Sequence, residues 1–207
     1  MANANKIKYG LRHVYYAKAT DDGTGVLTYD TPVAIPGAVN LTLSQEGEDN
    51  PFYADDVVYW RNPSNNGYSG SLEIALVPDS FYTDILGFVI DNDGVMLESA
   101  DQKTSEFALM FEFQGDVSAT RHLLYRCSVT RPDVAGATKE AAIEPQTETL
   151  NISAMPRISD FAVKQRCPAD SAAYDTWFDA VHEPAISESA SNGDENGDEN
   201  GDENLGA

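Results

Sequence analysis

Clustered carboxylates are the first residues in this sequence that could do chemistry. Asp91-Asn92-Asp93-Gly94 offers the oxygen ligands that calcium prefers. The calcium-loop pattern also needs a third acid or amide before its glycine and a glutamate at position twelve, where this chain has Gln102. Asp55 and Asp56 are adjacent, so on a strand they point to opposite faces and cannot work as an acid–base pair. We therefore predict a plain turn at 91–94 and no catalytic carboxylate pair.

Histidine and cysteine, the other residues with catalytic or metal-binding potential, are scattered. His13, His122 and His182 have no fixed spacing, and the chain has neither a nucleophile elbow nor a glycine loop of the phosphate-binding type. Cys127 and Cys167 are far apart and lack the paired spacing of a metal site. We expect two reduced, packed thiols, in preference to a disulfide. The sequence predicts no enzyme, no metal and no cofactor.

Period-two alternation of apolar and polar residues predicts that most of the chain is β-strand. A helix is expected after Pro78, capped by Asp79 or Ser80, with Phe81, Ile85 and Phe88 in its apolar stripe and Val89 on the adjoining row. A second helix is expected after Asp170, with Tyr174, Trp177, Phe178 and Val181 on one side. The expected strands are 9–18, 26–29, 33–35, 39–43, 69–75, 105–114, 121–131, 147–154 and 157–166.

These elements predict a mainly β fold: a β-sandwich or small barrel of two antiparallel sheets with a flanking α-helix, a long inter-strand loop and a C-terminal helix. Residues 1–186 form the predicted domain. Residues 187–207 contain three Gly-Asp-Glu-Asn repeats and nothing apolar enough to offset ordering entropy, so we expect a disordered acidic tail.

The loop at 45–67 is far longer than the ~2–5 residues of an ordinary hairpin connection. Such a loop either packs on a neighbouring subunit, the interpretation we favour, or adds residues 57–60 as a strand to its own sheet. Aromatic residues are enriched at subunit contacts. The candidate interface residues are Phe52, Tyr53, Tyr59, Trp60, Glu46 and Glu48.

Charge narrows the range of partners. The formal charge is −21, and the last twenty residues hold seven acids and no base, which leaves −14 on the remainder. An acidic surface does not bind nucleic acid, because binding depends on Lys and Arg contacts to the phosphates. No run of residues approaches the ~18 apolar residues of a membrane helix. Since the first residues also lack a signal-peptide pattern, we expect the chain to stay in the cytoplasm until assembly or lysis.

Several short segments, in this order and spacing, resemble the major tail protein, or tail tube protein, of long non-contractile phage tails. The resemblance covers roughly residues 6–181. It rests on GLRHVYYA at 10–17, PGAV at 36–39 leading into QEGE at 45–48, FYAD at 52–55, the passage 70–84, and EPQTETL at 144–150. It implies a virion protein with no catalysis that assembles into stacked hexameric rings, a hollow tube through which DNA is ejected. The acidic repeats depart from the family pattern.

The resemblance also implies partners: other copies of the chain, a tape-measure protein inside the tube, and tail terminator and initiator proteins. DNA would pass through the lumen without specific binding, and no membrane is involved. Two alternatives stay open. One is a carbohydrate-binding β-sandwich that stacks Tyr53, Tyr59 and Trp60 on sugar rings. The other is a different structural protein of the tail or of the head–tail connector.

Overall fold

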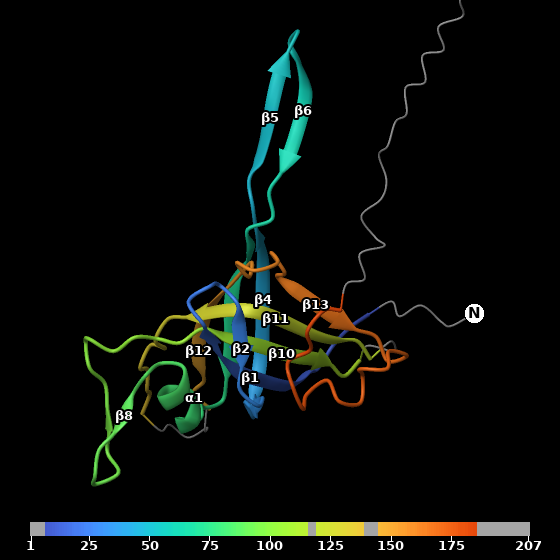
Figure 1. Ribbon diagram of the computed structural model, residues 1–207. Coiled ribbons are helices and arrows are strands. Elements are labelled where there is room, and N and C mark those ends of the chain that lie inside the picture. Colours follow the sequence, from blue (N-terminus) through green and yellow to red (C-terminus); the bar gives the residue numbers. More distant parts are fainter. Residues whose placement is uncertain (1–6, 116–118, 139–144, 186–207) are drawn as a thin grey trace, which may run out of the picture.

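Alternating apolar residues fold most of this chain into antiparallel strands, and the computed structural model describes residues 7–115, 119–138 and 145–185 (Figure 1). The predicted acidic tail and its boundary with the domain lie outside these residues. The elements in chain order are β1 Leu11–Asp21, β2 Leu27–Tyr29, β3 Val33–Ala34, β4 Ala38–Glu46, β5 Asp49–Ala54, β6 Val57–Pro63, β7 Gly67–Ile74, α1 Asp79–Asp84, β8 Val89–Ile90, β9 Met96–Leu97, β10 Phe107–Phe113, β11 Arg121–Val129, β12 Glu148–Met155 and β13 Lys164–Cys167.

Nine strands form one antiparallel sheet in the order β2-β1-β10-β11-β12-β7-β4, with β3 paired to β1 and β13 paired to β11. The first half of β11 pairs with β13 and its second half with β12. The sheet curls, so that β4 at one end of this order lies against β1 near the other. The expectation of a mainly β, sandwich-like fold with a flanking helix is confirmed, whereas the expected C-terminal helix does not form in the described residues. Its layers are hydrogen-bonded into a continuous sheet.

The first core fills the inside of the curl and is closed by α1. The Phe81 ring meets the Tyr16 and Phe107 rings edge-on, with centroids 5.1 and 5.5 Å away. The Tyr16 hydroxyl also donates a 2.8 Å hydrogen bond to Asp84, which ties β1 to the helix. Burial raises the pKa of Tyr16 to about 12. This short helix is therefore held by tertiary packing rather than by its own hydrogen bonds.

The second core lies on the outer face of the same strands. Because successive strand residues point to opposite faces, Phe107 and Leu109 enter the first core while Ala108 and Met110 enter the second. The chain after β13 covers this outer face, and Trp177 is buried there. β10 is consequently buried on both sides, as its nearly unbroken apolar sequence requires.

The side chains of β11 do not follow simple alternation in its second half. A register irregularity where β10 meets β11 puts Leu124 and Cys127 in the first core and Tyr125 in the second, although simple alternation separates Leu124 from Cys127. The expected strand at 157–166 is too long. Only Lys164–Cys167 pairs, because residues 158–160 form a turn.

The expected helix after Pro78 forms as α1 but needs correction at both ends. Pro78 rather than Asp79 or Ser80 occupies the N-cap of α1, and no side chain caps it. Val89, expected beside the apolar stripe, lies exposed in β8.

No helix forms after Asp170 in the described part of the chain. Instead the N–H groups of Ser171, Tyr174 and Trp177 each donate to the carbonyl three residues earlier, at 3.1, 3.0 and 3.2 Å, which makes successive turns. Repeated three-residue steps place Tyr174 and Trp177 on one side, as a helix would, so the apolar spacing suited both structures.

Candidate subunit interface

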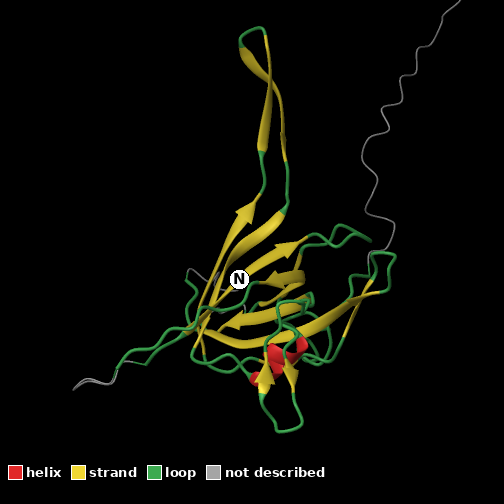
Figure 2. Ribbon diagram, turned by 90° about the vertical axis from the view of Figure 1, so that its left-hand side faces the viewer, coloured by secondary structure: helices red, strands yellow, loops and turns green. Residues whose placement is uncertain are grey.

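The segment expected as a long loop is a two-stranded hairpin, β5 and β6, which projects from the main sheet (Figures 1 and 2). The turn between the strands is Asp55-Asp56, with φ of 50° and 63°. Two consecutive positive φ angles are typical of a type I′ turn, which matches the twist of a hairpin, and aspartate tolerates them better than most residues. In Figure 2 the hairpin points away from the end of the molecule that carries α1.

Apolar side chains cover both faces of this hairpin and are exposed. Phe52 pairs across the strands with Trp60, and Tyr53 pairs with Val58, after a register shift. Cross-strand partners share a face and successive residues alternate, so each pair lies on a different face. The exposed large side chains each show between 46% and 73% of their surface to solvent: Phe52, Tyr53, Val57, Val58, Tyr59 and Trp60. Monomeric proteins rarely expose so much contiguous apolar surface.

The base of the hairpin is fixed to the sheet by hydrogen bonds. The N–H groups of Ser64 and Asn66 donate to the carbonyls of Glu48 and Glu46 at 2.9 and 2.8 Å. The Ser69 hydroxyl donates to the Glu46 carboxylate. A side chain at Gly47 would lie 2.1 Å from the Ser64 carbonyl oxygen, so glycine permits this close approach. The hairpin therefore leaves the sheet in a defined direction.

The structure separates the six candidate residues into two groups. Phe52, Tyr53, Tyr59 and Trp60 lie on the projecting strands, whereas Glu46 and Glu48 lie at the base. Within the described chain β6 pairs only with β5, so residues 57–60 do not add a strand to the main sheet. The role of these residues in a subunit contact remains a prediction. Val57 and Val58 belong to the same exposed surface, and their position directly after an Asp-Asp turn was the sequence signal for a hairpin.

A second, smaller hairpin is also apolar and exposed. Strands β8 and β9 carry exposed Val89, Ile90 and Leu97. Its turn contains Asp91, whose carboxylate accepts hydrogen bonds from the N–H groups of Asp93 and Val95 at 2.9 and 2.8 Å. The predicted turn at 91–94 is confirmed. Sequence reasoning missed this hairpin because its strands are two residues long.

One buried carboxylate, that of Glu112, is surrounded by cations. It accepts hydrogen bonds from Arg12 Nε at 2.8 Å and Arg121 Nε at 3.0 Å, and His13 Nδ1 lies 2.6 Å away. A bulge in β1, where His13 has a φ of 49°, lets consecutive residues reach the same group. Burial raises the pKa of Glu112, but bonds from Arg121 and His13 outweigh it and hold the pKa below its usual value.

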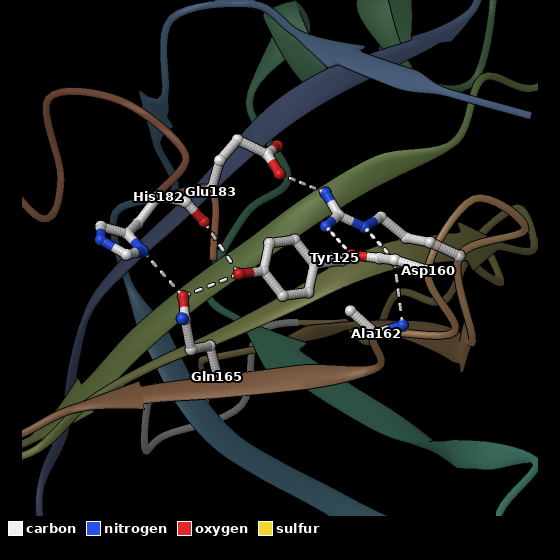
Figure 3. Close-up of polar contacts among 7 residues, drawn as sticks. Tyr125, Asp160, Ala162, Gln165, His182 and Glu183 are labelled. Atoms are coloured by element: carbon white, nitrogen blue, oxygen red, sulfur yellow. Dashed lines mark hydrogen bonds and ion pairs between the residues drawn. The ribbon is translucent and has the colours of Figure 1, made fainter. Parts of the chain in front are cut away.

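A polar cluster attaches the C-terminal segment to the sheet (Figure 3). Arg157 donates to Asp160 at 3.0 and 2.5 Å and to Glu183 at 2.7 Å, while its guanidinium lies 4.2 Å from the centre of the Tyr125 ring. The Tyr125 hydroxyl lies 2.7 Å from Gln165 Oε1 and 2.8 Å from the His182 carbonyl oxygen. These contacts hold neighbouring segments together. The polar groups of the cluster bond to one another, so the cluster has a structural role.

The residues first considered for chemistry are thus dispersed. His13 contacts Glu112, and His182 Nδ1 contacts Gln165 at 3.0 Å. Cys127 and Cys167 are buried free thiols in different cores, and burial raises the pKa of Cys127. Over the described ranges no three metal-binding side chains of His, Cys, Asp or Glu gather at one place. No helix in these ranges has the length and apolar character needed to span a bilayer.

Comparison with solved structures finds several chains of similar fold, one of which comes from a prophage particle. The fold is similar to a chain in the cryo-EM structure of the anti-feeding prophage baseplate, 6-fold symmetrised, with a TM-score of 0.43 and 12% sequence identity. The similarity covers 80% of this chain and 97% of that chain. No protein-family model matches the sequence, and no curated protein sequence matches it.

Proposed function

We propose that this chain is a structural protein of a phage-type tail and, more narrowly, a tail tube subunit that associates with copies of itself into stacked hexameric rings. The observation that carries the proposal is the projecting β5–β6 hairpin, which exposes aromatic residues on both faces. The tail-protein resemblance at 10–17, 36–48 and 52–55 supports the narrower form. These segments fall in β1, in β4 and on the hairpin itself.

The area of this surface is large enough for a stable contact. With fully exposed aromatic side chains of ~150–250 Å², the exposed fractions of Phe52, Tyr53, Tyr59 and Trp60 amount to roughly 500 Å². Specific interfaces bury about 800 Å² per partner, so the aromatic residues alone would supply more than half. A hairpin with apolar residues on both faces can be enclosed by a groove or by two neighbouring copies.

A contact between a projecting hairpin and a different surface of the next copy is not self-complementary. Such contacts generate rings when the rotation closes and filaments when it does not. A tube of stacked rings has both kinds of contact: those within a ring close on themselves, and those between rings repeat along the tube. A tube of this kind would hold a tape-measure protein, end at terminator and initiator proteins, and form part of the virion after assembly in the host cytoplasm.

DNA would cross the lumen without adhering if carboxylates line the wall, since phosphate finds no Lys or Arg partners there. The charge of −14 outside the last twenty residues supports this. A reconstructed tube whose inner wall is mainly basic would contradict the expectation.

Electron microscopy of the purified full-length protein tests the proposal directly. Negative-stain images over a range of protein concentrations should show rings or tubes with sixfold symmetry. A monodisperse monomer that binds glycans through Tyr53, Tyr59 and Trp60 would support the carbohydrate-binding alternative instead. A different closed assembly, such as a single ring that never stacks, would favour a connector protein.

A further inference from the structure

Most basic side chains of this acidic protein are already paired within the described part of the chain. The arginines with carboxylate partners are Arg12, Arg61, Arg121, Arg126, Arg131 and Arg157. Lys8, Lys18, Lys103, Lys164 and Arg166 have no carboxylate partner there, although the chain holds 34 acids and only 13 basic residues. Five of the eleven described basic residues are thus unpaired, and three of these five, Lys8, Lys164 and Arg166, lie close together.

These three cations form one patch, which we call the basic patch. Lys164 and Arg166 are two residues apart on β13 and so lie on the same face. The Lys8 ammonium lies 4.8 Å from the centre of the Phe113 ring, which contacts His122, the cross-strand partner of Arg166. Burial, followed by the charges of Lys8 and Arg166, lowers the pKa of Lys164. Repulsion among these like charges is unfavourable, and a bound anion would offset it.

The basic patch borders a groove rather than a flat surface. An open groove of about 430 Å³ is lined by residues that include Tyr68, Phe161, Lys164 and Arg166. The Lys164 ammonium lies 5.3 Å from the centre of the Tyr68 ring, and Phe161 is exposed. An extended peptide could place carboxylates on the cations and its backbone along the groove.

The last described residues contact β13, although Glu183 and Pro184 themselves border a different pocket beside β2. His182 Nδ1 lies 3.0 Å from Gln165 Oε1 (Figure 3). Gln165 lies between Lys164 and Arg166 in the sequence of β13, and its side chain points to the opposite face of the strand from theirs, so the tail reaches the patch around β13. Description stops at Ala185, and the first acid of the tail, Glu188, follows three residues later. Three residues span up to ~10 Å and the whole of 186–207 up to ~70 Å, so the tail can reach the patch.

We propose that the acidic segment 187–207 binds the basic patch formed by Lys8, Lys164 and Arg166. The segment brings seven carboxylates and no base to a place where, among the described residues, three cations without carboxylate partners lie together. Tethering gives such a segment an effective concentration in the millimolar range, so weak charge pairs suffice. A free nucleic acid could also supply anions, but it would first have to approach a surface that carries −14. This proposal concerns the folded subunit and holds whether or not tubes form.

Zero-length carbodiimide cross-linking of the full-length protein tests it, with the cross-linked peptides identified by mass spectrometry. At low salt, Lys8 and Lys164 should link to tail acids between Glu188 and Glu203, and the links should fade at 0.5 M salt because exposed pairs are screened. Lys18 and Lys103 are the internal controls. Equal tail cross-linking to these controls, or none to the patch lysines, overturns the proposal. Mixing isotope-labelled and unlabelled protein distinguishes binding within one copy from binding to another.

A matched pair of variants gives a second readout on folded protein. The variant Lys8→Gln/Lys164→Gln should increase the rate at which a glutamate-specific protease cuts the tail by about threefold or more, because cleavage follows the unbound population. The variant Lys18→Gln/Lys103→Gln removes the same charge and should leave the rate unchanged. If the patch variant instead abolishes binding of a single-stranded oligonucleotide while tail cleavage stays the same, the patch serves a nucleic acid and the proposal is wrong.

Discussion

The clearest consequence of an exposed, projecting hairpin is that its aromatic residues can be removed without unfolding the protein. Phe52 and Trp60 are cross-strand partners with 59% and 56% of their surfaces exposed. Their loss in Phe52→Ser/Trp60→Ser removes only a surface cross-strand pair, which contributes ~0.2–1 kcal/mol to folding. We expect the melting temperature, followed by circular dichroism, to stay within a few degrees of wild type.

The same double substitution should have a large effect on self-association. The exposed parts of the two rings amount to roughly 120 and 140 Å², from side-chain areas of ~200–250 Å². At ~25 cal/mol per Å², their burial at a contact contributes up to about 6 kcal/mol, and the cost of ordering the interface reduces this value. Retaining half of that value corresponds to an affinity change of about a hundredfold. Sedimentation velocity across a concentration series, with electron microscopy of the same samples, measures it.

A control separates the hairpin from general surface effects. Leu76→Ser/Val134→Ser also removes two exposed apolar side chains, neither of which lies on the hairpin. This variant should assemble like wild type. The reasoning is refuted if Phe52→Ser/Trp60→Ser builds normal tubes, or if it melts far below wild type, since the second result would mean that the hairpin belongs to the core of its own subunit.

Three further predictions concern the folded subunit. Glu112→Gln should lower the free energy of unfolding by about 2–3 kcal/mol, because it removes the buried negative charge and replaces one acceptor oxygen with an NH2 donor that faces cations; partial exposure of those cations limits the loss. Since the folded-state pKa of Glu112 is depressed, its contribution is complete above the ordinary glutamate pKa and lost as pH falls through the folded value, so denaturant titrations between pH 6 and pH 3 should show a flatter acid limb in the variant. Gly70→Ala should disrupt the pairing of β4 with β7, because a Cβ would lie 1.8 Å from the Thr42 carbonyl oxygen, whereas Gly136→Ala has open space and should be neutral; melting curves of both variants test this difference. Deletion of 187–207 should leave folding and assembly intact, with at most a few degrees' fall in melting temperature from the loss of tail binding, and a truncation that fails to fold or polymerise contradicts it.

The strands of the main sheet were predictable because each alternates cleanly or is apolar on both faces. β7, β10 and β12 begin and end within about three residues of the predicted bounds, and β10 pairs with β11, the next strand along the chain. Long-range order was not predictable in the same way. Nothing in the local pattern of β11 indicates that its two halves pair with different strands, since that depends on which segments meet after the sheet curls.

At the candidate interface the sequence predicted which residues are exposed but not the structure that carries them. Composition located the aromatic surface correctly at 52–60, but the length of the segment concealed that it is a hairpin. The signal was present in Asp55-Asp56, which adopt positive φ between two β-forming stretches. The turns after Asp170 were harder to predict, because residues spaced at 174, 177 and 178 suit a helix and a series of three-residue turns equally well.

The covering of the second core by residues after β13 has a consequence for how the protein is made. Ala108, Met110, Leu123 and Tyr125 are translated well before Trp177, which closes over them. During synthesis, the outer face of β10 and β11 therefore stays uncovered until the last covering residue has left the ribosome, and chains stalled before that point present an adhesive apolar surface to chaperones or to one another. Folding of this subunit is completed by its latest described residues, which couples solubility to full-length translation.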